Sequence, residues 1–374
     1  MTNIHAPRVI RCSLRLGGIA AALLLCGCSG GGNRAASNTP PASSVPPPAP
    51  AVQNPSPISA PALVGGTVPV QSTPWSFDGG QGSNLRTAYF SIYTTETDPV
   101  MVERLPRFLE AALDRYSTAA GMMKLPMPRQ KMETFVMANR PQWQALTVRI
   151  LGSSARPLTY IERGGFTTGG RSFLYNIGQS DTFAIASHEG WHQFTQITFA
   201  EQMPIWLEEG MATLMEGHRW SGQGVLFLPW GNPERYNGLC AAASKRTLLS
   251  LEDILTQSPQ SLMNRPGNSN EPAVAYYAQV WSLVHFLREG EGGRYRPGLE
   301  KLLSDAASGV LSGAVREKFG PRAGMLAQRS GALVFETYFT SVSDAQAQYT
   351  KFLGMLTSGQ AKGAVAAGTS PVSN

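Results

Sequence analysis

The feature that most constrains this chain is the stretch 187–194, which contains the pattern His-Glu-x-x-His at His188, Glu189 and His192. The residues before it, 181–186, are compatible with a helix. Side chains four residues apart lie on the same face of an α-helix, so the two imidazoles face the same way. Both histidines can therefore bind one metal ion, with the carboxylate of Glu189 beside it.

A third metal ligand is predicted on the helix that follows, Pro204–Met215, which has proline near its start. A catalytic zinc site has three protein ligands and leaves one position open for water. This helix carries two neighbouring glutamates, Glu208 and Glu209, which point about 100° apart around the helix axis. On spacing alone, either carboxylate can supply the third ligand.

The two motifs together resemble those of the gluzincin metallopeptidases, in which a Leu-x-Glu-Gly-x-Ala segment supplies the third zinc ligand. Residues 207–212 match this segment, and the family's ligand, the glutamate directly before glycine, corresponds to Glu209. The metzincin class is excluded, because this chain has Thr195 and Thr198 where that class has its glycine and its third histidine.

A wider set of motifs is similar to the peptidase MA-like domains of bacterial envelope proteins. These motifs are a glycine-rich strand, His-Glu-Gly-x-His-Gln, Pro-x-Trp-Leu-x-Glu-Gly-x-Ala and Tyr-Ala-Gln-x-Trp, and they lie between Thr87 and Leu287. The resemblance implies an α+β, zincin-like fold of the thermolysin type. In that fold a small mixed sheet packs on the metal-binding helix, and a helical part follows towards the C-terminus.

The resemblance also implies the role of each residue at the centre. His188, His192 and Glu209 would hold Zn²⁺, which lowers the pKa of a water molecule towards about 7. Glu189 would be the general base that takes the proton and later passes it to the leaving amine.

The remaining polar groups of the centre are open to more than one assignment. Tyr277 is the expected donor to the oxyanion, and its neighbour Tyr276 competes for this role, because gluzincins use a Tyr or His of the C-terminal helices. His285, two turns along, is expected to be structural. Asp181 and Glu216 are candidates to accept hydrogen bonds from the ligand imidazoles.

The expected function is peptide-bond hydrolysis, with a peptide or protein as substrate. The chain lacks the Gly-x-Met-Glu-Asn motif of the aminopeptidase branch, which favours an endopeptidase or an unusual substrate over an aminopeptidase. Two alternatives stay open. The scaffold can bind a partner without catalysis, or the same residues can hydrolyse a non-peptide substrate of the envelope.

The N-terminal region predicts export and lipid anchoring. Residues 1–27 form a signal, with arginines before a short apolar run, and Cys28 lies where a bacterial lipobox has its lipidated cysteine. The expected location is the bacterial cell envelope on the periplasmic side, with Ser29 favouring the outer membrane. Residues 28–74 are rich in Pro, Gly and Ser and predict a tether between the lipid and the folded domain.

Residues 75–356 are predicted to form the metallopeptidase domain, and 357–374 a flexible tail. The domain begins with a strand, a helix and a second strand, and another strand directly precedes the histidine helix. A loop-rich part is expected after Trp143. In chain order, the predicted strands are 87–93, 132–137 and 172–177, and the further helices are 102–119, 250–255, 274–288, 297–307 and 327–355.

Charge and cysteine content exclude several other classes of protein. The formal net charge is +6, and three of the positive charges are arginines of the predicted signal, which is too mild for a nucleic-acid protein. The paired glycines of 164–170 lack the Lys-Ser/Thr ending of a nucleotide loop. Of 4 cysteines only Cys240 lies in the domain, where a half-buried thiol is expected, and His218 is expected to be structural.

Overall fold

The computed structural model describes residues 67–159, 161, 164–222, 224–263, 271–326 and 331–372, together with two short strands nearer the N-terminus. Cys28 and most of the predicted signal and tether lie outside the described residues. Within the signal, only strand β1 (Ala20–Leu23) is described, and it pairs with a strand of the domain. Strand β2 (Leu63–Val64) lies within the predicted tether.

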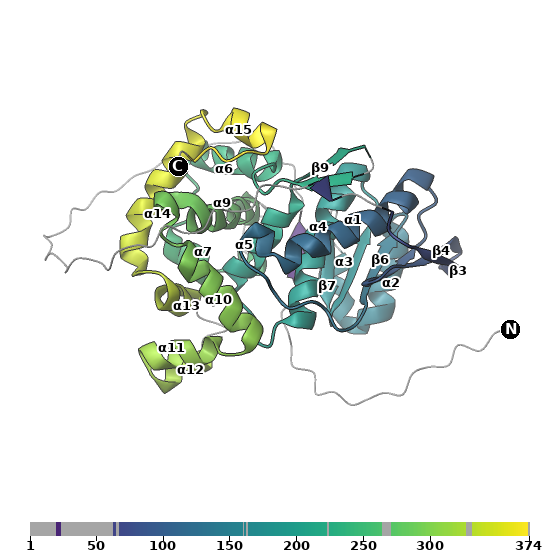
Figure 1. Ribbon diagram of the computed structural model, residues 1–374, viewed down its shortest axis with the longest axis horizontal. Coiled ribbons are helices and arrows are strands. Elements are labelled where there is room, and N and C mark those ends of the chain that lie inside the picture. The colour runs from purple at the N-terminus through teal and green to yellow at the C-terminus, as the bar shows by residue number, and fades with distance from the viewer. Residues whose placement is uncertain are drawn as a thin grey trace, which may run out of the picture.

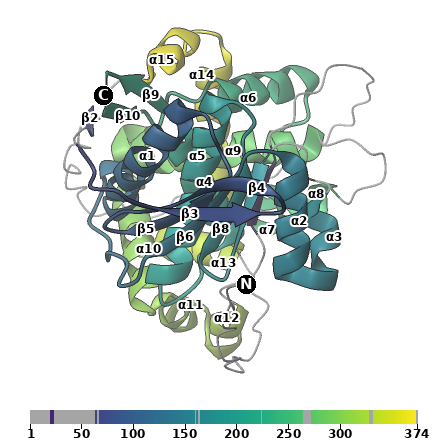
Figure 2. The same ribbon diagram turned by 90° about the vertical axis from the view of Figure 1, so that its right-hand side faces the viewer.

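A mixed sheet forms one side of the molecule, in the order β1-β7-β8-β6-β5-β4-β3 (Figures 1 and 2). The β5/β6 and β6/β8 pairs are parallel, and the other pairs are antiparallel. A second, three-stranded sheet has the order β2-β10-β9. The strands of the domain are β3 (Gln71–Phe77), β4 (Gly80–Arg86), β5 (Phe90–Thr94), β6 (Met132–Met137), β7 (Gly164–Thr168), β8 (Arg171–Tyr175), β9 (His218–Ser221) and β10 (Gly224–Phe227).

Helix α1 (Pro99–Ser117) joins the parallel strands β5 and β6, so the predicted strand–helix–strand unit is confirmed. It is not the beginning of the domain, because the β3–β4 hairpin, which was not predicted, precedes it. Asp98 caps this helix by accepting a hydrogen bond from the backbone N–H of Val100 at 2.9 Å. The apolar side chains at the predicted spacing, such as Leu105 and Phe108, are fully buried. They pack against the helix that carries the two histidines.

The histidine helix is α4 (Gln179–Thr198), and it lies between the sheet and the helical side of the molecule (Figure 1). It packs on β7, β8 and α1, and on its other side against α5 (Ile205–Glu216). Helix α5 in turn packs against the long helix α9 (Glu271–Gly293). The two predicted metal-binding helices are therefore buried neighbours at the centre of the fold.

The later helices form the other side of the molecule (Figure 1). Helix α7 begins as predicted at Ser250, whose hydroxyl accepts from the backbone N–H of Asp253. The predicted helix 327–355 consists of two helices, because a new helix begins after Ser341. The later helices are α6 (Pro233–Lys245), α7 (Leu251–Thr256), α8 (Pro259–Met263), α10 (Arg296–Ser308), α11 (Leu311–Phe319), α12 (Pro321–Leu326), α13 (Gly331–Tyr338), α14 (Val342–Thr357) and α15 (Lys362–Ala367).

The prediction of a loop-rich part after Trp143 is wrong. This part contains α2 (Arg140–Leu151) and the short helix α3 (Arg156–Thr159). Asn139 caps α2, and the Trp143 side chain is fully buried under the sheet strand β8, donating to the carbonyl of Phe173. Because α2 buries only a narrow stripe of side chains, its helical periodicity is weak in the sequence.

The predicted ends of the domain also differ from the structure. Strand β3 begins at Gln71 and includes Pro74, which is tolerated because β3 is an edge strand. The expected flexible tail instead carries α15, in which the Val365 side chain is buried. The folded part therefore continues to at least residue 372.

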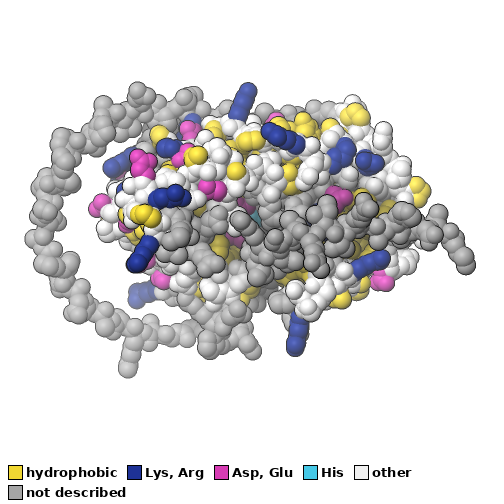
Figure 3. Space-filling view, turned by 90° about the horizontal axis from the view of Figure 1, so that it is seen from below, with side chains coloured by type: hydrophobic (Ala, Val, Ile, Leu, Met, Phe, Trp, Pro, Cys, Tyr) yellow, Lys and Arg dark blue, Asp and Glu magenta, His cyan; other side chains and the backbone are white. Residues whose placement is uncertain are grey.

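The structure confirms the coarse fold class, an α+β protein with a mixed sheet on the histidine helix. None of the described helices is long and apolar enough to cross a membrane. On the face drawn in Figure 3, the visible Lys and Arg side chains are scattered and form no continuous patch.

Candidate metal centre

Close helix packing fixes the position of the His-Glu-x-x-His segment. A Cβ atom on Gly190 would lie 2.4 Å from the hydroxyl oxygen of Tyr116 on α1. That hydroxyl donates to the backbone carbonyl of Ser187 at 2.8 Å, which ties α1 to α4. On α5, a Cβ on Gly210 would lie 2.5 Å from a methyl carbon of Val284 on α9. The glycine of each motif therefore permits a close approach between helices.

Three buried polar atoms converge between α4 and α5: Nε2 of His188, Nε2 of His192 and Oε2 of Glu209. They lie within 4.8 Å of one another, and Oε2 is 3.3 Å and 3.6 Å from the two nitrogens. The side chains are at most 3% exposed, and none of the three atoms makes a hydrogen bond within the described residues. A buried polar atom without a hydrogen bond destabilises the fold by about 1–3 kcal/mol. One cation bound to all three atoms would remove this cost.

A zinc ion fits these three atoms. Two ligands that are each about 2.0–2.1 Å from a tetrahedral zinc lie roughly 3.3 Å apart, which is close to the two nitrogen–oxygen distances given above. Two imidazole nitrogens and one carboxylate oxygen are also a donor set that zinc favours. The structure thus brings the predicted ligands His188, His192 and Glu209 together in a group that could hold a metal ion, called the metal-binding group below.

Each histidine has a carboxylate behind it. Nδ1 of His188 lies 2.8 Å from Oε1 of Glu216, and Nδ1 of His192 lies 2.9 Å from Oε1 of Glu208. Because a carboxylate accepts, each Nδ1 carries a hydrogen, and Nε2 is the ring nitrogen that would bind a metal. These positions distinguish Glu208 from Glu209 as the third ligand. The carboxylate of Glu209 faces the two Nε2 atoms, whereas that of Glu208 bonds to Nδ1 of His192 and orients its ring.

Glu216 is itself held by two side chains of the segment that leads into and begins α6. Arg235 donates from Nε at 2.9 Å and from Nη2 at 2.7 Å, and Asn232 donates from Nδ2 at 2.6 Å. Burial alone would raise the pKa of Glu216, but the charge of Arg235 and the bond from His188 lower it to about 2. Glu216 therefore stays ionised while buried.

Glu189 lies between the metal-binding group and strand β7. The hydroxyl of Thr167 donates to its Oε2 at 2.8 Å, and a Cβ on Gly165 would lie 3.1 Å from its Cγ. Burial raises the pKa of Glu189, although the nearby His192 and His188 oppose the shift. A raised pKa suits a carboxylate that accepts a proton from water and returns it.

Both tyrosines predicted as oxyanion donors lie on α9 beside the centre. The Tyr277 ring lies 6.2 Å from the His188 ring, and the guanidinium carbon of Arg235 is 5.1 Å from the centre of the Tyr277 ring. Tyr276 is fully buried, and its hydroxyl has no hydrogen-bond partner within the described residues. Burial and then the charge of Glu209 raise the pKa of both tyrosines, so both stay protonated as donors.

The other histidines and the cysteine of the domain do not belong to the group of His188, His192 and Glu209. His285 stacks on Trp230 at 3.5 Å between ring centres, and Nδ1 of His218 lies 2.9 Å from the backbone carbonyl of Glu216. The prediction that both are structural agrees with these contacts. Cys240 is half-buried, as predicted.

Of the two predicted partners of the ligand histidines, Asp181 and Glu216, the structure places Glu216 at hydrogen-bonding distance from His188. Asp181 instead lines a cavity next to His188. Asn232, Arg235 and Thr167 were not predicted. They are distant in sequence from the histidines and belong to no local motif, so only the fold reveals them.

No protein-family model matches the chain, and no curated protein matches it significantly. The chemistry of the centre must therefore be inferred from its own residues.

Proposed function

We propose that this chain is a zinc-dependent peptidase of the gluzincin type with a zincin-like fold. The observation that carries the proposal is the convergence of three buried atoms that lack hydrogen bonds: Nε2 of His188, Nε2 of His192 and Oε2 of Glu209. Three protein ligands, with no fourth among the described residues, are typical of a catalytic zinc and not of a structural one. Glu189 beside them supplies the base that a hydrolase needs.

The residues of this chain divide the reaction between them. Zinc, when bound, lowers the pKa of a water molecule and polarises the carbonyl that is attacked. Glu189 takes a proton from the attacking water at its carboxylate and passes it to the nitrogen of the leaving amine. Thr167 holds one carboxylate oxygen of Glu189 in place by donating at 2.8 Å. Tyr277 or Tyr276 donates to the oxygen on which negative charge develops.

The position of the sheet supports an extended polypeptide as the substrate. Strand β7 pairs with β8 on one side and with β1 of the predicted signal on the other, and its residues Gly165 and Thr167 lie against Glu189. If β1 leaves with the signal, β7 becomes a sheet edge, and such an edge binds an extended peptide through main-chain hydrogen bonds. Strand β1 pairs with β7 in this antiparallel manner. A peptide on this edge would lie directly beside the proposed general base.

We propose a location at the bacterial cell envelope. Support comes from the sequence of the predicted signal and from Cys28, which would carry the lipid. The Pro, Gly and Ser of residues 28–74 would hold the domain away from the membrane surface, and Ser29 favours the outer membrane.

Cleavage of a defined peptide mixture tests the proposed activity. The wild type and Glu189→Gln would be incubated with the mixture and the products identified by mass spectrometry. We expect new internal cleavages with the wild type and a rate at least 1000-fold lower with Glu189→Gln, on the order expected for loss of a general base. Equal cleavage by both proteins would show a contaminating protease. A zinc-loaded wild type that cleaves no peptide would favour the non-peptide substrate or the binding role.

A further inference from the structure

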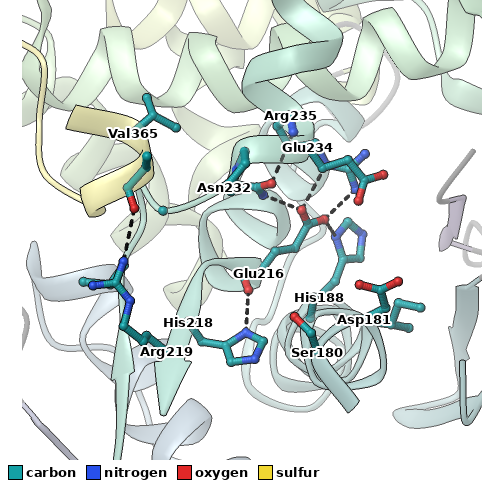
Figure 4. Close-up of a pocket in the computed structure, with 16 residues that line it drawn as sticks. Ser180, Asp181, His188, Glu216, His218, Arg219, Asn232, Glu234, Arg235 and Val365 are labelled. Atoms are coloured by element: carbon teal, nitrogen blue, oxygen red, sulfur yellow. Dashed lines mark hydrogen bonds and ion pairs between the residues drawn. The ribbon is translucent and has the colours of Figure 1, made fainter. Parts of the chain in front are cut away.

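The structure contains buried arginines of two kinds. Arg235 is 3% exposed and donates to both carboxylate oxygens of Glu216, so its charge is neutralised inside the fold (Figure 4). Arg115, in the last turn of α1, and Arg288, on α9, are also buried, at 7% and 3% exposed. Within the described residues, neither of these two donates a hydrogen bond to a carboxylate, and neither belongs to the metal-binding group.

Buried nitrogen atoms of both arginines make no hydrogen bond within the described residues. These atoms are Nε of Arg115 and both Nε and Nη1 of Arg288. Nη2 of Arg288 lies 3.8 Å from Oε1 of Glu289, which is too long for a hydrogen bond. Glu289 instead accepts from Nε1 of Trp230 at 3.0 Å and from the hydroxyl of Ser370. A guanidinium group does not lose its charge by deprotonation in a protein, so these donors stay charged.

A third arginine adds positive charge at the same place. Arg296 lies at the start of α10, the helix that follows α9, and it is 5% exposed. Its Nε donates to Oε1 of Glu300 at 2.9 Å. Burial lowers the pKa of Arg288, and the charges of Arg115 and Arg296 lower it further, against the opposing charge of the neighbouring glutamate. Both other arginines are therefore close enough to act on Arg288.

The three arginines carry more positive charge than the acids beside them compensate. Glu289 and Glu300 balance two of the three charges, at 3.8 Å and 2.9 Å. Asp114, the acid next to Arg115 in the sequence, is exposed to solvent. A buried charge without a counter-ion strongly destabilises a fold. An anion that accepts from Arg115 and Arg288 would remove this cost.

The number of donors indicates the chemical class of the anion. Arg115 and Arg288 come from separate helices, and each has buried N–H groups that need an acceptor. A carboxylate that binds one guanidinium group through both of its oxygens is already occupied by that group. A phosphate ion carries its oxygens tetrahedrally around one centre and can accept from two guanidinium groups at once. A tetrahedral oxyanion therefore fits these donors better than a carboxylate.

We propose that Arg115 and Arg288 bind one tetrahedral oxyanion of the phosphate type between the end of α1 and the junction of α9 and α10. Arg288 lies about three helical turns beyond Tyr277 on α9, roughly 16 Å along the helix axis, so the site is separate from the metal-binding group. The anion would hold α1 to the helical side of the molecule and so stabilise the fold. The inference does not depend on the proposed peptidase function.

The first test is thermal unfolding of the full chain at constant ionic strength in phosphate, sulfate, acetate or chloride, after dialysis against phosphate-free buffer. We expect saturating phosphate or sulfate to raise the wild-type melting temperature by several degrees relative to chloride or acetate. Arg288→Met replaces the buried charge by an apolar side chain and should not respond. Phosphate bound at the metal-binding group would stabilise both proteins alike. Arg129→Gln changes an exposed arginine and, as the matched control, should keep the wild-type response.

The second test is calorimetric titration of phosphate into the same proteins. We expect the dissociation constant to increase at least about ten-fold in Arg288→Met and in Arg115→Gln, because each loses charged hydrogen bonds to the anion. In phosphate-free buffer, Arg288→Met should melt at or above the wild-type temperature, because a buried charge without a counter-ion is gone. A loss of binding in this variant is then not a loss of folding.

Three results would overturn the inference. One is equal stabilisation of the wild type and Arg288→Met by phosphate. Another is equal stabilisation of the wild type by chloride and by phosphate. The third is a wild type that binds no phosphate in the titration and releases neither phosphate nor sulfate on denaturation, as measured by ion chromatography. None of these results bears on zinc binding or peptide cleavage, so the proposed function is tested separately.

Discussion

Three glutamates of a single helix surround the two histidines. Glu209 faces the metal position, Glu208 bonds to His192, and Glu216 bonds to His188. Both histidines are thereby held in the tautomer and the orientation that leave Nε2 available to a metal. All three contacts depend on the packing of α5 against α4, and the contact of Glu216 depends also on Asn232 and Arg235.

Replacing Glu216 tests this arrangement. Glu216→Gln removes the anion behind His188 and leaves the buried Arg235 without its charge partner, so we expect zinc affinity to fall 10–100-fold. Competition with a chromophoric zinc chelator measures this. The exposed Glu103→Gln should keep the wild-type affinity. Unchanged affinity in Glu216→Gln would mean that this carboxylate does not orient the ligand.

Because Glu216 is ionised beside Arg235, we expect the unfolding free energy of the protein to decrease in acid. The pKa of Glu216 is about 2 in the folded chain and near 4.5 when unfolded, so its contribution is fully present above pH 4.5 and is lost as the pH falls towards 2. The difference corresponds to about 3 kcal/mol. Urea unfolding in chelator should show that the stability difference between wild type and Glu216→Gln shrinks between pH 5 and pH 3. A constant difference over this range would contradict the assignment.

At the scale of elements, the packing of α4 against α1 depends on a glycine at position 190. Gly190→Ala would place a methyl group 2.4 Å from the Tyr116 hydroxyl, so α1 and α4 must separate. We expect a loss of about 1–3 kcal/mol in unfolding free energy and weaker zinc binding.

Gly354→Ala is the control for that change. Gly354 lies within α14, where an added Cβ meets nothing within 4 Å, and we expect equal or slightly greater stability. The measurement is the melting temperature of each variant, compared with that of the wild type. Equal effects of the two substitutions would show that α1 and α4 are not in close contact.

The elements that sequence predicted best have strong local patterns. The sequence predicts strand β6 with both of its bounds correct, and the helices α5 and α9 to within a few residues. The spacing of the apolar side chains marks these elements, and a proline marks the start of α5. The two ligand histidines could be predicted because they lie four residues apart, about one turn along a single helix. Helix α2 was missed because it buries few side chains, and the contacts of Arg235 were missed because they join residues far apart in the chain.

At the scale of the whole molecule, the segment 362–370 belongs to the domain. Helix α15 buries Val365, Ala366 accepts from Arg219, and Ser370 bonds to Glu289. The polar and small residues of this segment predict a flexible tail, but its few apolar side chains find a place against α6 and β9. Composition alone cannot reveal such docking.

Truncation after Thr357 is therefore expected to destabilise the protein. Exposing the Val365 site and its surroundings costs about 1–3 kcal/mol, which lowers the melting temperature by several degrees. Removal of only residues 373 and 374 serves as the control and should change nothing. A truncated chain with the wild-type melting temperature would contradict the docking of α15.

The central claim is that His188, His192 and Glu209 hold one catalytic zinc ion. Its most direct test is the zinc content per folded chain, measured by plasma mass spectrometry after exhaustive dialysis, for wild type, Glu189→Gln, His188→Gln and Glu209→Gln. We predict about one zinc per chain in the first two proteins, because Glu189 is not a ligand, and less than about a tenth in the last two. A folded wild type without zinc, or ligand variants that keep it, would contradict the claim.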